Sequence, residues 1–593
     1  MLFSEAEWTQ RYAAQVRHLS GVYCNTRTTN TPWGTAEQNG LGKFSDFTHQ
    51  ALKAIKELGV THIWYTGVPH HALLADYREF GITNDHPAVV KGRAGSPYAV
   101  KDYYSVNPDL ADDPAQRQEE FAALIERTHT HGLKVIIDIV PNHVARCYQG
   151  QDNPDGISDL GANDNTQTEY DRHNNFYYIP QQEFQVPDIP DSYQPLINES
   201  LFPSYREFPA KWTGNGSREA KPGFDDWYET AKINYGIRPD GSKDFSELPD
   251  DYSQHDYRKH HEFWQDKEVP DSWKKFRDIA LYWLDKGVDG FRYDMAEMVP
   301  VEFWSFMNSS IKMHRPEAFL LAEVYQPNLY RDYIHLGKMD YLYDKVDLYD
   351  LLKNIIQQKS STSRITEVQR QLADIEHHML NFLENHDEQR IASPEFAGHP
   401  ELAKPAILLS ATLSSSPTMI YFGQEVGEAG AENAGFGQPS RTSIFDYIGV
   451  PAHQRWMNNG KFDGGQLSEQ EKSLRFFYQS VLNFTLNTKA LTGSYHDLYT
   501  VNQENMGTGR DHCFLFARKL DGQVVIVAVN FHPEESFHFP VLIPEELGLT
   551  ENNYCFREMI MGESKIELER KNSKVSGRLT LPPLAALAFC FKK

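Results

Sequence analysis

Short apolar runs alternate with amphipathic segments through most of the chain. Apolar runs of this length are typical of buried strands, and hydrophobic positions three and four residues apart are typical of helices that cover a sheet. Two such helical segments are 47–58 and 116–131, the second followed by Gly132 as a C-cap. The candidate strands are 16–23, 61–66, 135–140, 288–293, 319–324, 341–348, 379–383 and 418–422.

This order of elements predicts an α/β protein built on a (β/α)8 TIM barrel. An open sheet is disfavoured because no glycine-rich phosphate turn follows the first strand. We therefore assign residues 1–143 and 270–490 to a barrel domain.

Two regions depart from the alternating pattern. Residues 144–269 show neither periodicity and are rich in Asp, Asn, Gly, Pro and Tyr. A connection of this length would be unusual as a plain loop, so we expect an irregular domain inserted after the third strand. Residues 491–593 consist of short alternating segments, which predict a C-terminal antiparallel β-sandwich.

Charge and composition exclude several classes of partner. The net charge is −24, from 82 acidic and 58 basic residues, and such a field repels nucleic acids and anionic membranes. No apolar run is long enough to cross a bilayer, and the first residues have no signal-peptide pattern. Five scattered cysteines form neither a disulfide framework nor a zinc pattern, so we expect a cytoplasmic protein. The oligomeric state is left open.

Four of the strand-like runs lead into acidic residues, which are Asp138, Asp294, Glu323 and Asp387. In a parallel barrel the C-terminal ends of all strands meet at one rim, where active sites lie. Two carboxylates that face each other across a glycosidic bond, with a third that holds the sugar, are what retaining glycoside hydrolysis requires. The aromatic content of 13% suits the stacking of sugar rings. The pattern predicts a sugar-cleaving enzyme.

The position of each acidic residue indicates its role. Asp294 is the expected nucleophile, because Arg292 two residues earlier points the same way and favours the ionised carboxylate. Glu323 ends an apolar run, and apolar surroundings favour the protonated carboxyl that an acid/base catalyst needs. Asp387 is expected to bind sugar hydroxyls and to favour a distorted ring. Asp138 is expected to be structural, as strand-end Asp residues usually are.

These stretches resemble, in the same order, the sequence regions of the α-amylase family, glycoside hydrolase family 13. Residues 138–143 are similar to the first region, Arg292 and Asp294 to the second, Glu323 to the third and 385–387 to the fourth. Three further stretches that fit the same family are 59–64, 232–234 and 417–425. The resemblance implies a barrel, an inserted domain and a C-terminal β-sandwich.

The resemblance also implies residues that bind the substrate. Tyr98 would stack beneath the sugar at the cleavage point, and Arg390 would lie close to Asp387. His143 and His386 would donate hydrogen bonds to hydroxyls of the same sugar. Arg292 and Glu297 belong to the same expected substrate-binding set.

The chain departs from many starch-cleaving members just after the nucleophile, where Glu297 and Met298 replace a Lys-His pair. Lys232, at a position where many α-amylases have Asp, makes the chain more similar to neopullulanases and oligo-1,6-glucosidases. Glu297 is expected to accept hydrogen bonds from the leaving sugar. The alternative is that Glu297 pairs with a basic residue behind the barrel.

The expected chemistry requires no cofactor, but a structural calcium ion is left open. Asn142 matches a common calcium ligand of the family, whereas other ligands of that site are replaced. A second candidate lies in the stretch 153–159, where Asp155 and Asp159 offer oxygen ligands around a glycine turn.

The leading hypothesis is a retaining hydrolase of α-1,4 bonds in maltooligosaccharides or related α-glucans, with α-1,6 bonds as an open addition. A transglycosylase on the same scaffold is the alternative, because only the competition between water and sugar acceptors separates the two. A non-catalytic glucan-binding relative is disfavoured, because the complete set of carboxylates, arginine and histidines is present.

Overall fold

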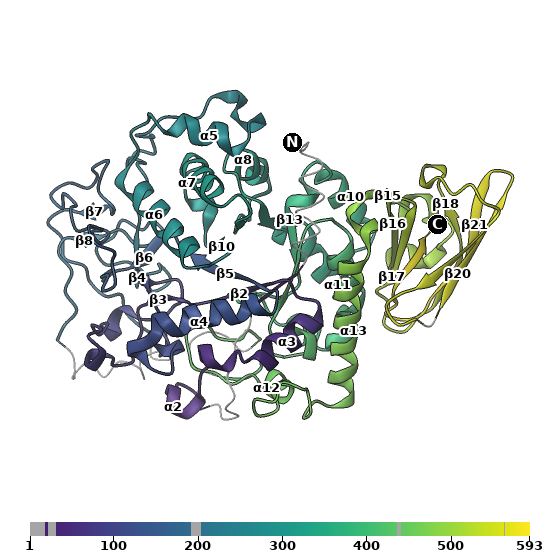
Figure 1. The fold of residues 1–593 in the computed structure, drawn as a ribbon, viewed down its shortest axis with the longest axis horizontal. Helices are drawn as coiled ribbons and strands as arrows, with labels where there is room; N and C mark the ends of the chain where they lie inside the picture. The colour runs from purple at the N-terminus through teal and green to yellow at the C-terminus, as the bar shows by residue number, and fades with distance from the viewer. Residues whose placement is uncertain are drawn as a thin grey trace.

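The computed structural model describes residues 18–21, 31–190, 203–433, 435, 440–562 and 564–592. Eight parallel strands close into a barrel (Figure 1). Barrel strands that follow one another along the chain lie side by side, and the last pairs with the first. The barrel strands are β1 His18–Gly21, β2 His62–Tyr65, β5 Lys134–Ile139, β10 Gly290–Tyr293, β11 Phe319–Ala322, β12 Tyr341–Tyr343, β13 Met379–Phe382 and β14 Thr418–Tyr421. The predicted barrel is therefore confirmed.

Each predicted strand segment overlaps one barrel strand, although the first is described only over β1. The main difference concerns the sixth strand, predicted over 341–348, which ends at Tyr343. The Asp344 side chain accepts a hydrogen bond from the backbone N–H of Leu348 and turns the chain into a π-helical turn, Lys345–Tyr349.

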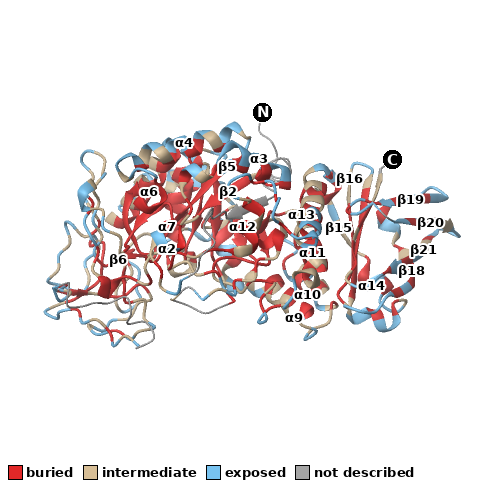
Figure 2. Cartoon of the chain, turned by 90° about the horizontal axis from the view of Figure 1, so that it is seen from below, coloured by how far each residue is buried: buried red, intermediate tan, exposed pale blue. Residues whose placement is uncertain are grey.

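Helices pack around the barrel through their apolar faces (Figure 2). In α3, Thr48 caps the N-terminus by accepting from the N–H of Ala51, and the apolar face buries Leu52, Ile55 and Leu58. The helices before and around the barrel are α2 Ala36–Asn39, α3 His49–Leu58, α4 Arg117–Thr130, α6 Asp271–Asp285, α7 Val301–His314, α8 Tyr330–His335, α9 Asp350–Ile356, α10 Arg364–Gln371, α11 Lys404–Thr412, α12 Pro451–Met457 and α13 Glu469–Asn487.

Strand register places the acidic residues at one rim. Arg292 of β10 lies opposite Asp138 of β5 and opposite Leu321 of β11. Asp294 and Glu323 therefore come directly after the ends of two neighbouring strands. Because these strands are buried on both faces, a one-residue slip would move charged side chains into the core, and the register is strongly specified.

Residues between β5 and α6 form the irregular excursion that the sequence predicts. It contains β6 His143–Ala145, β7 Tyr178–Ile179, β8 Ala210–Lys211, β9 Thr230–Lys232 and the helix α5 Tyr257–Trp264, which was not predicted. A separate small core holds it together, with Tyr177 stacked on Trp212 at 4.4 Å between ring centroids. β6 pairs with β9, which sets Lys232 beside His143. The hairpin of β3 Pro69–His71 and β4 Val100–Val106, before β5, was also not predicted.

The C-terminal region is an eight-stranded antiparallel sheet in the order β15-β16-β17-β22-β19-β20-β21-β18. The antiparallel β domain expected in the C-terminal part of the chain is therefore confirmed. The bounds of its strands are β15 Ser494–Asp497, β16 Cys513–Leu520, β17 Gln523–Asn530, β18 Phe537–Ile543, β19 Asn553–Glu558, β20 Lys565–Lys571, β21 Lys574–Leu581 and β22 Ala586–Lys592, with the helix α14 Tyr499–Asn502 between β15 and β16. The domain boundaries given above stay predictions.

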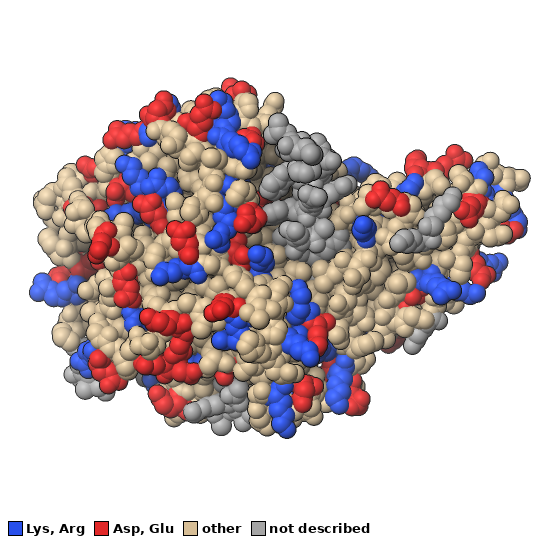
Figure 3. Space-filling view, in the orientation of Figure 1, with Lys and Arg blue, Asp and Glu red and all other residues tan. Residues whose placement is uncertain are grey.

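Within the described ranges, none of the helices combines the length and the apolar character that a membrane span needs. Acidic and basic side chains are interleaved over the visible face of the barrel (Figure 3).

Candidate active site

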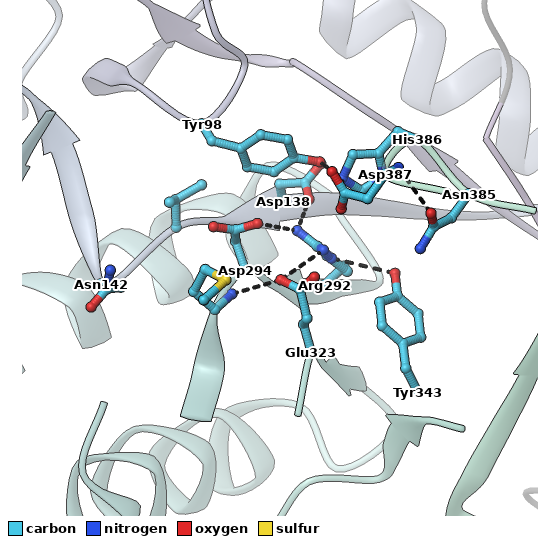
Figure 4. A network of polar contacts seen from close by, with 12 residues as sticks. Tyr98, Asp138, Asn142, Arg292, Asp294, Glu323, Tyr343, Asn385, His386 and Asp387 are labelled. Atoms are coloured by element: carbon cyan, nitrogen blue, oxygen red, sulfur yellow. Dashed lines mark hydrogen bonds and ion pairs between the residues drawn. The ribbon is translucent and has the colours of Figure 1, made fainter. Parts of the chain in front are cut away.

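Arg292 lies at the centre of a buried cluster of carboxylates (Figure 4). Its Nη1 is 2.7 Å from Oδ1 of Asp294 and 3.4 Å from Oδ1 of Asp138. Its Nη2 is 3.0 Å from Oε2 of Glu323, and its Nε donates to the hydroxyl of Tyr343 at 3.4 Å. One fully buried guanidinium thus compensates three acidic side chains, which would otherwise be costly to bury.

The charges in this cluster are strongly coupled. Burial raises the pKa of Asp294 well above its usual value, Arg292 opposes that rise, and the neighbouring Glu323 adds to it. Burial likewise raises the pKa of Asp138, again opposed by Arg292. Asp294 and Glu323 thus share one buried volume and one guanidinium. One ionised and one protonated carboxyl is the state that a retaining hydrolase requires.

Both carboxyl oxygens of Glu323 are engaged by protein donors. Oε1 accepts a hydrogen bond from the Tyr325 hydroxyl at 2.6 Å, and Oε2 accepts one from the backbone N–H of Met295 at 2.8 Å. Met295 has a left-handed backbone, with φ of 45°, directly after Asp294. Tyr325 and Met295 were not among the predicted site residues. Their position two residues after Glu323 and one after Asp294 is the signal that could have identified them.

Asp387 lies with Tyr98 and His386 on the other side of Arg292 (Figure 4). Nε2 of His386 is 2.6 Å from the Tyr98 hydroxyl and 3.0 Å from Oδ2 of Asp387, and the two rings stack at 5.1 Å. The Asn385 side chain accepts from the backbone N–H of Asp387 and shapes this turn. The Asp387 side chain is 45% exposed, so it is the carboxylate most open to a ligand.

The pKa of Asp387 shifts in the opposite direction from that of Asp294. Burial favours the neutral form, but the neighbouring His386, Arg292 and Arg441 outweigh it and lower the pKa of Asp387 to about 2. Asp387 is therefore ionised at neutral pH, as expected for a group that accepts hydrogen bonds from sugar hydroxyls.

His143 is buried at the start of β6 and lies beside the backbone of Tyr98. Burial and the nearby Lys232 and Lys91 lower the pKa of His143 to about 3, so the imidazole is neutral. Its Nδ1 accepts from the Asn142 side-chain amide at 3.0 Å, which leaves Nε2 to carry the proton. Contact between the neutral His143 imidazole and a sugar hydroxyl stays a prediction.

A cleft borders Tyr98 and His386. Its further lining residues are Thr66, Pro97, Tyr421, Phe422, Thr442, Ser443, Ile444, Ile448 and Val450.

The expectation that Arg390 binds substrate is wrong. Arg390 is fully buried, and its Nη1 pairs with Oε2 of Glu384 at 2.9 Å. Its other donors contact the Phe422 carbonyl and the Thr442 hydroxyl. Because the guanidinium is fully buried and makes four hydrogen bonds to protein acceptors, it does not face a sugar. Arg441 is the second arginine whose charge acts on Asp387, and nothing local in the sequence marks it.

Glu297 lies just past the end of β10, as expected. Its Oε2 accepts hydrogen bonds from the backbone N–H groups of Tyr325 at 2.8 Å and Gln326 at 3.1 Å. This contact differs from the basic partner considered as an alternative. Contact between Glu297 and a leaving sugar stays a prediction.

The residues that resemble a calcium site do not fit a metal ion. Oδ1 of Asn142 accepts a hydrogen bond from the ammonium of Lys232, a cation that would repel a second one. In the other candidate stretch, Asp155 is exposed and Oδ1 of Asp159 already accepts from Asn153 at 2.6 Å. The described part of the chain contains no cluster of three or more His, Cys, Asp or Glu residues suited to a metal.

Comparisons with known proteins agree with this fold. Residues 33–218 and 250–455 match the family profile described as "Alpha amylase, catalytic domain". Neopullulanase 2 of Thermoactinomyces vulgaris is 21% identical over 564 residues, which are 93% of this chain and 74% of that protein. A cyclomaltodextrinase of Bacillus sp is 21% identical over 430 residues, which are 71% of this chain and 59% of that protein. The crystal structure of an alpha-amylase from Geobacillus thermoleovorans, complexed with acarbose, is 17% identical, has a TM-score of 0.60 and is matched over 98% of this chain and 99% of that one.

Proposed function

The chain belongs to the alpha-amylase family, and from this premise we propose that it is a retaining glycoside hydrolase that cleaves α-glucosidic bonds in maltooligosaccharides or related α-glucans. The observation that carries the proposal is the pairing of Asp294 and Glu323 with one guanidinium at the rim of the barrel. This pairing brings a nucleophile and an acid to the same place, which is the requirement of the retaining mechanism.

In the first step, a carboxylate oxygen of Asp294 attacks the anomeric carbon while the glycosidic bond breaks. Glu323 transfers its proton to the departing oxygen, so that the leaving sugar departs as an alcohol. The positive charge that develops on the sugar ring is stabilised by the surrounding carboxylates, among them Asp387. The products of this step are a glycosyl ester of Asp294 and an ionised Glu323.

In the second step, Glu323 takes a proton from water while the water oxygen attacks the anomeric carbon, and the ester bond to Asp294 breaks. Both carboxyls return to their starting states. If a sugar hydroxyl takes the place of water, the same step makes a transglycosylation product. The transglycosylase therefore stays the alternative function.

We further propose that short or branched oligosaccharides are better substrates than starch granules. The relatives named neopullulanase and cyclomaltodextrinase support this proposal, as do Glu297 and Met298 in place of a Lys-His pair. Product analysis on maltotriose, panose and pullulan tests bond preference. When maltotriose is the only substrate, products longer than maltotriose would favour transglycosylation.

The two carboxyl roles are tested with Asp294→Asn and Glu323→Gln. Asp294→Asn should abolish the glycosyl-enzyme that intact mass spectrometry detects after rapid quenching. Glu323→Gln should lower turnover of maltotriose by about 100- to 10,000-fold but spare α-glucosyl fluoride, whose leaving group needs little protonation. Asp340→Asn is the matched control, because Asp340 precedes β12 at the opposite end of the barrel, where it pairs with Lys312. Equal losses on both substrates would contradict the acid role of Glu323.

A further inference from the structure

The groups that contact Glu323 differ in whether they can accept a hydrogen bond. Oε2 faces the backbone N–H of Met295 at 2.8 Å and Nη2 of Arg292 at 3.0 Å. An amide nitrogen and a guanidinium are donors with no acceptor capacity. Oε1 faces the Tyr325 hydroxyl at 2.6 Å, and a hydroxyl can donate or accept.

This asymmetry determines where a protonated Glu323 can carry its hydrogen. A proton on Oε2 would point at two donors and would disrupt the hydrogen bond from Met295 and the ion pair with Arg292. A proton on Oε1 can instead be accepted by the Tyr325 oxygen after rotation of its hydroxyl. Oε1 is therefore the favoured site of the proton among the described contacts.

We propose that Tyr325 is a positioning residue that holds the acid proton of Glu323 on Oε1, and that Glu297 acts through Tyr325 by fixing its backbone. The proposal rests on the proposed function, in which Glu323 is the acid/base. When Glu323 is ionised, the Tyr325 hydroxyl donates to Oε1. When Glu323 is protonated, the hydroxyl accepts from Oε1 until the glycosidic oxygen of the substrate replaces it.

Glu297 connects the two segments that contact Glu323. Its Oε2 accepts from the N–H groups of Tyr325 and Gln326, in the loop that follows β11. Glu297 itself follows Met295 by two residues, and its carbonyl oxygen accepts from the hydroxyl of Tyr333 in α8 at 3.1 Å. The Met295 donor and the Tyr325 donor are thus tied together through one carboxylate.

The test of Tyr325 is the pH dependence of kcat/KM on maltotriose for Tyr325→Phe in the full chain. Loss of the hydroxyl removes a donor that stabilises ionised Glu323, so the alkaline limb should move to higher pH by about one unit. The loss of rate should be larger for maltotriose than for α-glucosyl fluoride, which needs little protonation. An unmoved alkaline limb would overturn the proposal.

Tyr330→Phe is the matched control. Tyr330 begins α8 in the same connection and is fully buried, and its hydroxyl has no hydrogen-bond partner among the described residues. Its replacement should leave the alkaline limb in place. A shift as large as that of Tyr325→Phe would mean that any change in this connection moves the limb, which would overturn the specific role of Tyr325.

The role of Glu297 is tested by comparing Glu297→Ala with Glu297→Gln. The Gln side chain retains an oxygen acceptor for the two N–H groups, so its pH profile should stay near that of the wild type. Glu297→Ala should shift the alkaline limb upward in the wild-type background and cause no further shift in Tyr325→Phe, because the two residues act in series. Additive shifts would overturn the role of Glu297 through Tyr325. Thermal unfolding of each variant shows whether it is folded.

A second readout separates this proposal from the proposed function. Protonated carboxyls react with a carbodiimide, and peptide mass spectrometry can follow the labelling of Glu323 against pH without any turnover. The labelling curve of Tyr325→Phe should lie at higher pH than that of the wild type, and coincident curves would overturn the role of Tyr325. Absence of wild-type turnover on α-glucans would instead contradict the proposed function.

Discussion

Asp294 and Glu323 contact the two terminal nitrogens of one guanidinium, with Oδ1 of Asp294 2.7 Å from Nη1 and Oε2 of Glu323 3.0 Å from Nη2 of Arg292. Because a guanidinium is planar and rigid, it sets the spacing of the two carboxyls more closely than two separate cations could. The retaining mechanism depends on that spacing, so Arg292 is both a charge partner and a spacer.

Replacement of Arg292 by Lys should therefore be severe. One ammonium cannot contact both carboxyls in the same geometry, and a carboxylate left unpaired in the core costs about 3–5 kcal/mol of unfolding free energy. We expect kcat/KM on maltotriose to fall by at least about 100-fold. Denaturant unfolding and steady-state kinetics measure the two effects. Near-wild-type activity in Arg292→Lys would contradict the spacer role.

Arg390→Met should lower the stability of the protein but not the activity of its folded fraction. Arg390 pairs with Glu384 in the core, so its loss should cost about 3–5 kcal/mol of unfolding free energy. The kcat/KM of the fraction that remains folded should be retained, because Arg390 is fully buried among protein acceptors. Adding Glu384→Gln should recover part of the stability by removing the unpaired charge. A raised KM with unchanged stability would instead support the predicted contact between Arg390 and a sugar.

The buried His143 predicts how stability depends on pH. Its pKa is lowered to about 3 by burial and by Lys232 and Lys91, whereas an unfolded histidine has a pKa of about 6.5. Between these values the unfolded state binds a proton that the folded state does not, so stability falls as pH is lowered from about 6.5 towards about 3. The advantage of the wild type over His143→Gln in chemical unfolding should shrink across this window. A constant difference would mean that His143 is protonated in the folded protein.

Removal of calcium should change neither the Tm nor the activity, because Asn142 is not expected to bind the ion. The Lys232 ammonium contacts the Asn142 oxygen, and burial lowers the pKa of Lys232 to about 7. We therefore expect EDTA to leave the Tm and the activity unchanged at pH 6, where Lys232 is mostly protonated. Lys232→Met, which removes the cation, is the control for whether this position can recruit calcium at all. A chelator-induced fall in Tm that calcium reverses would contradict the expectation.

Local sequence was sufficient for the barrel and for its acidic rim. Strand and helix periodicities depend on neighbouring residues, and a carboxylate directly after a buried strand must lie at the strand end whatever the rest of the fold does. For this reason the segments ending in Asp294 and Glu323 were placed correctly, as was the excursion after β5. The strand 341–348 was overextended because Lys345, Val346, Asp347 and Leu348 alternate polar and apolar, as in a half-buried strand, and the turn depends on one side chain, that of Asp344.

The contacts that complete the site join residues far apart in the chain. Arg390 meets Thr442, Lys232 meets Asn142, and Glu297 meets the loop that carries Tyr325. Whether an arginine faces substrate or a buried carboxylate depends on how loops from different strands pack, and no periodicity encodes that. The sequence by itself determined the fold class and the carboxylates, because both follow from local pattern. The tertiary structure alone decided which charged groups pair with one another, because burial makes unpaired charges costly and only the folded chain brings the partners together.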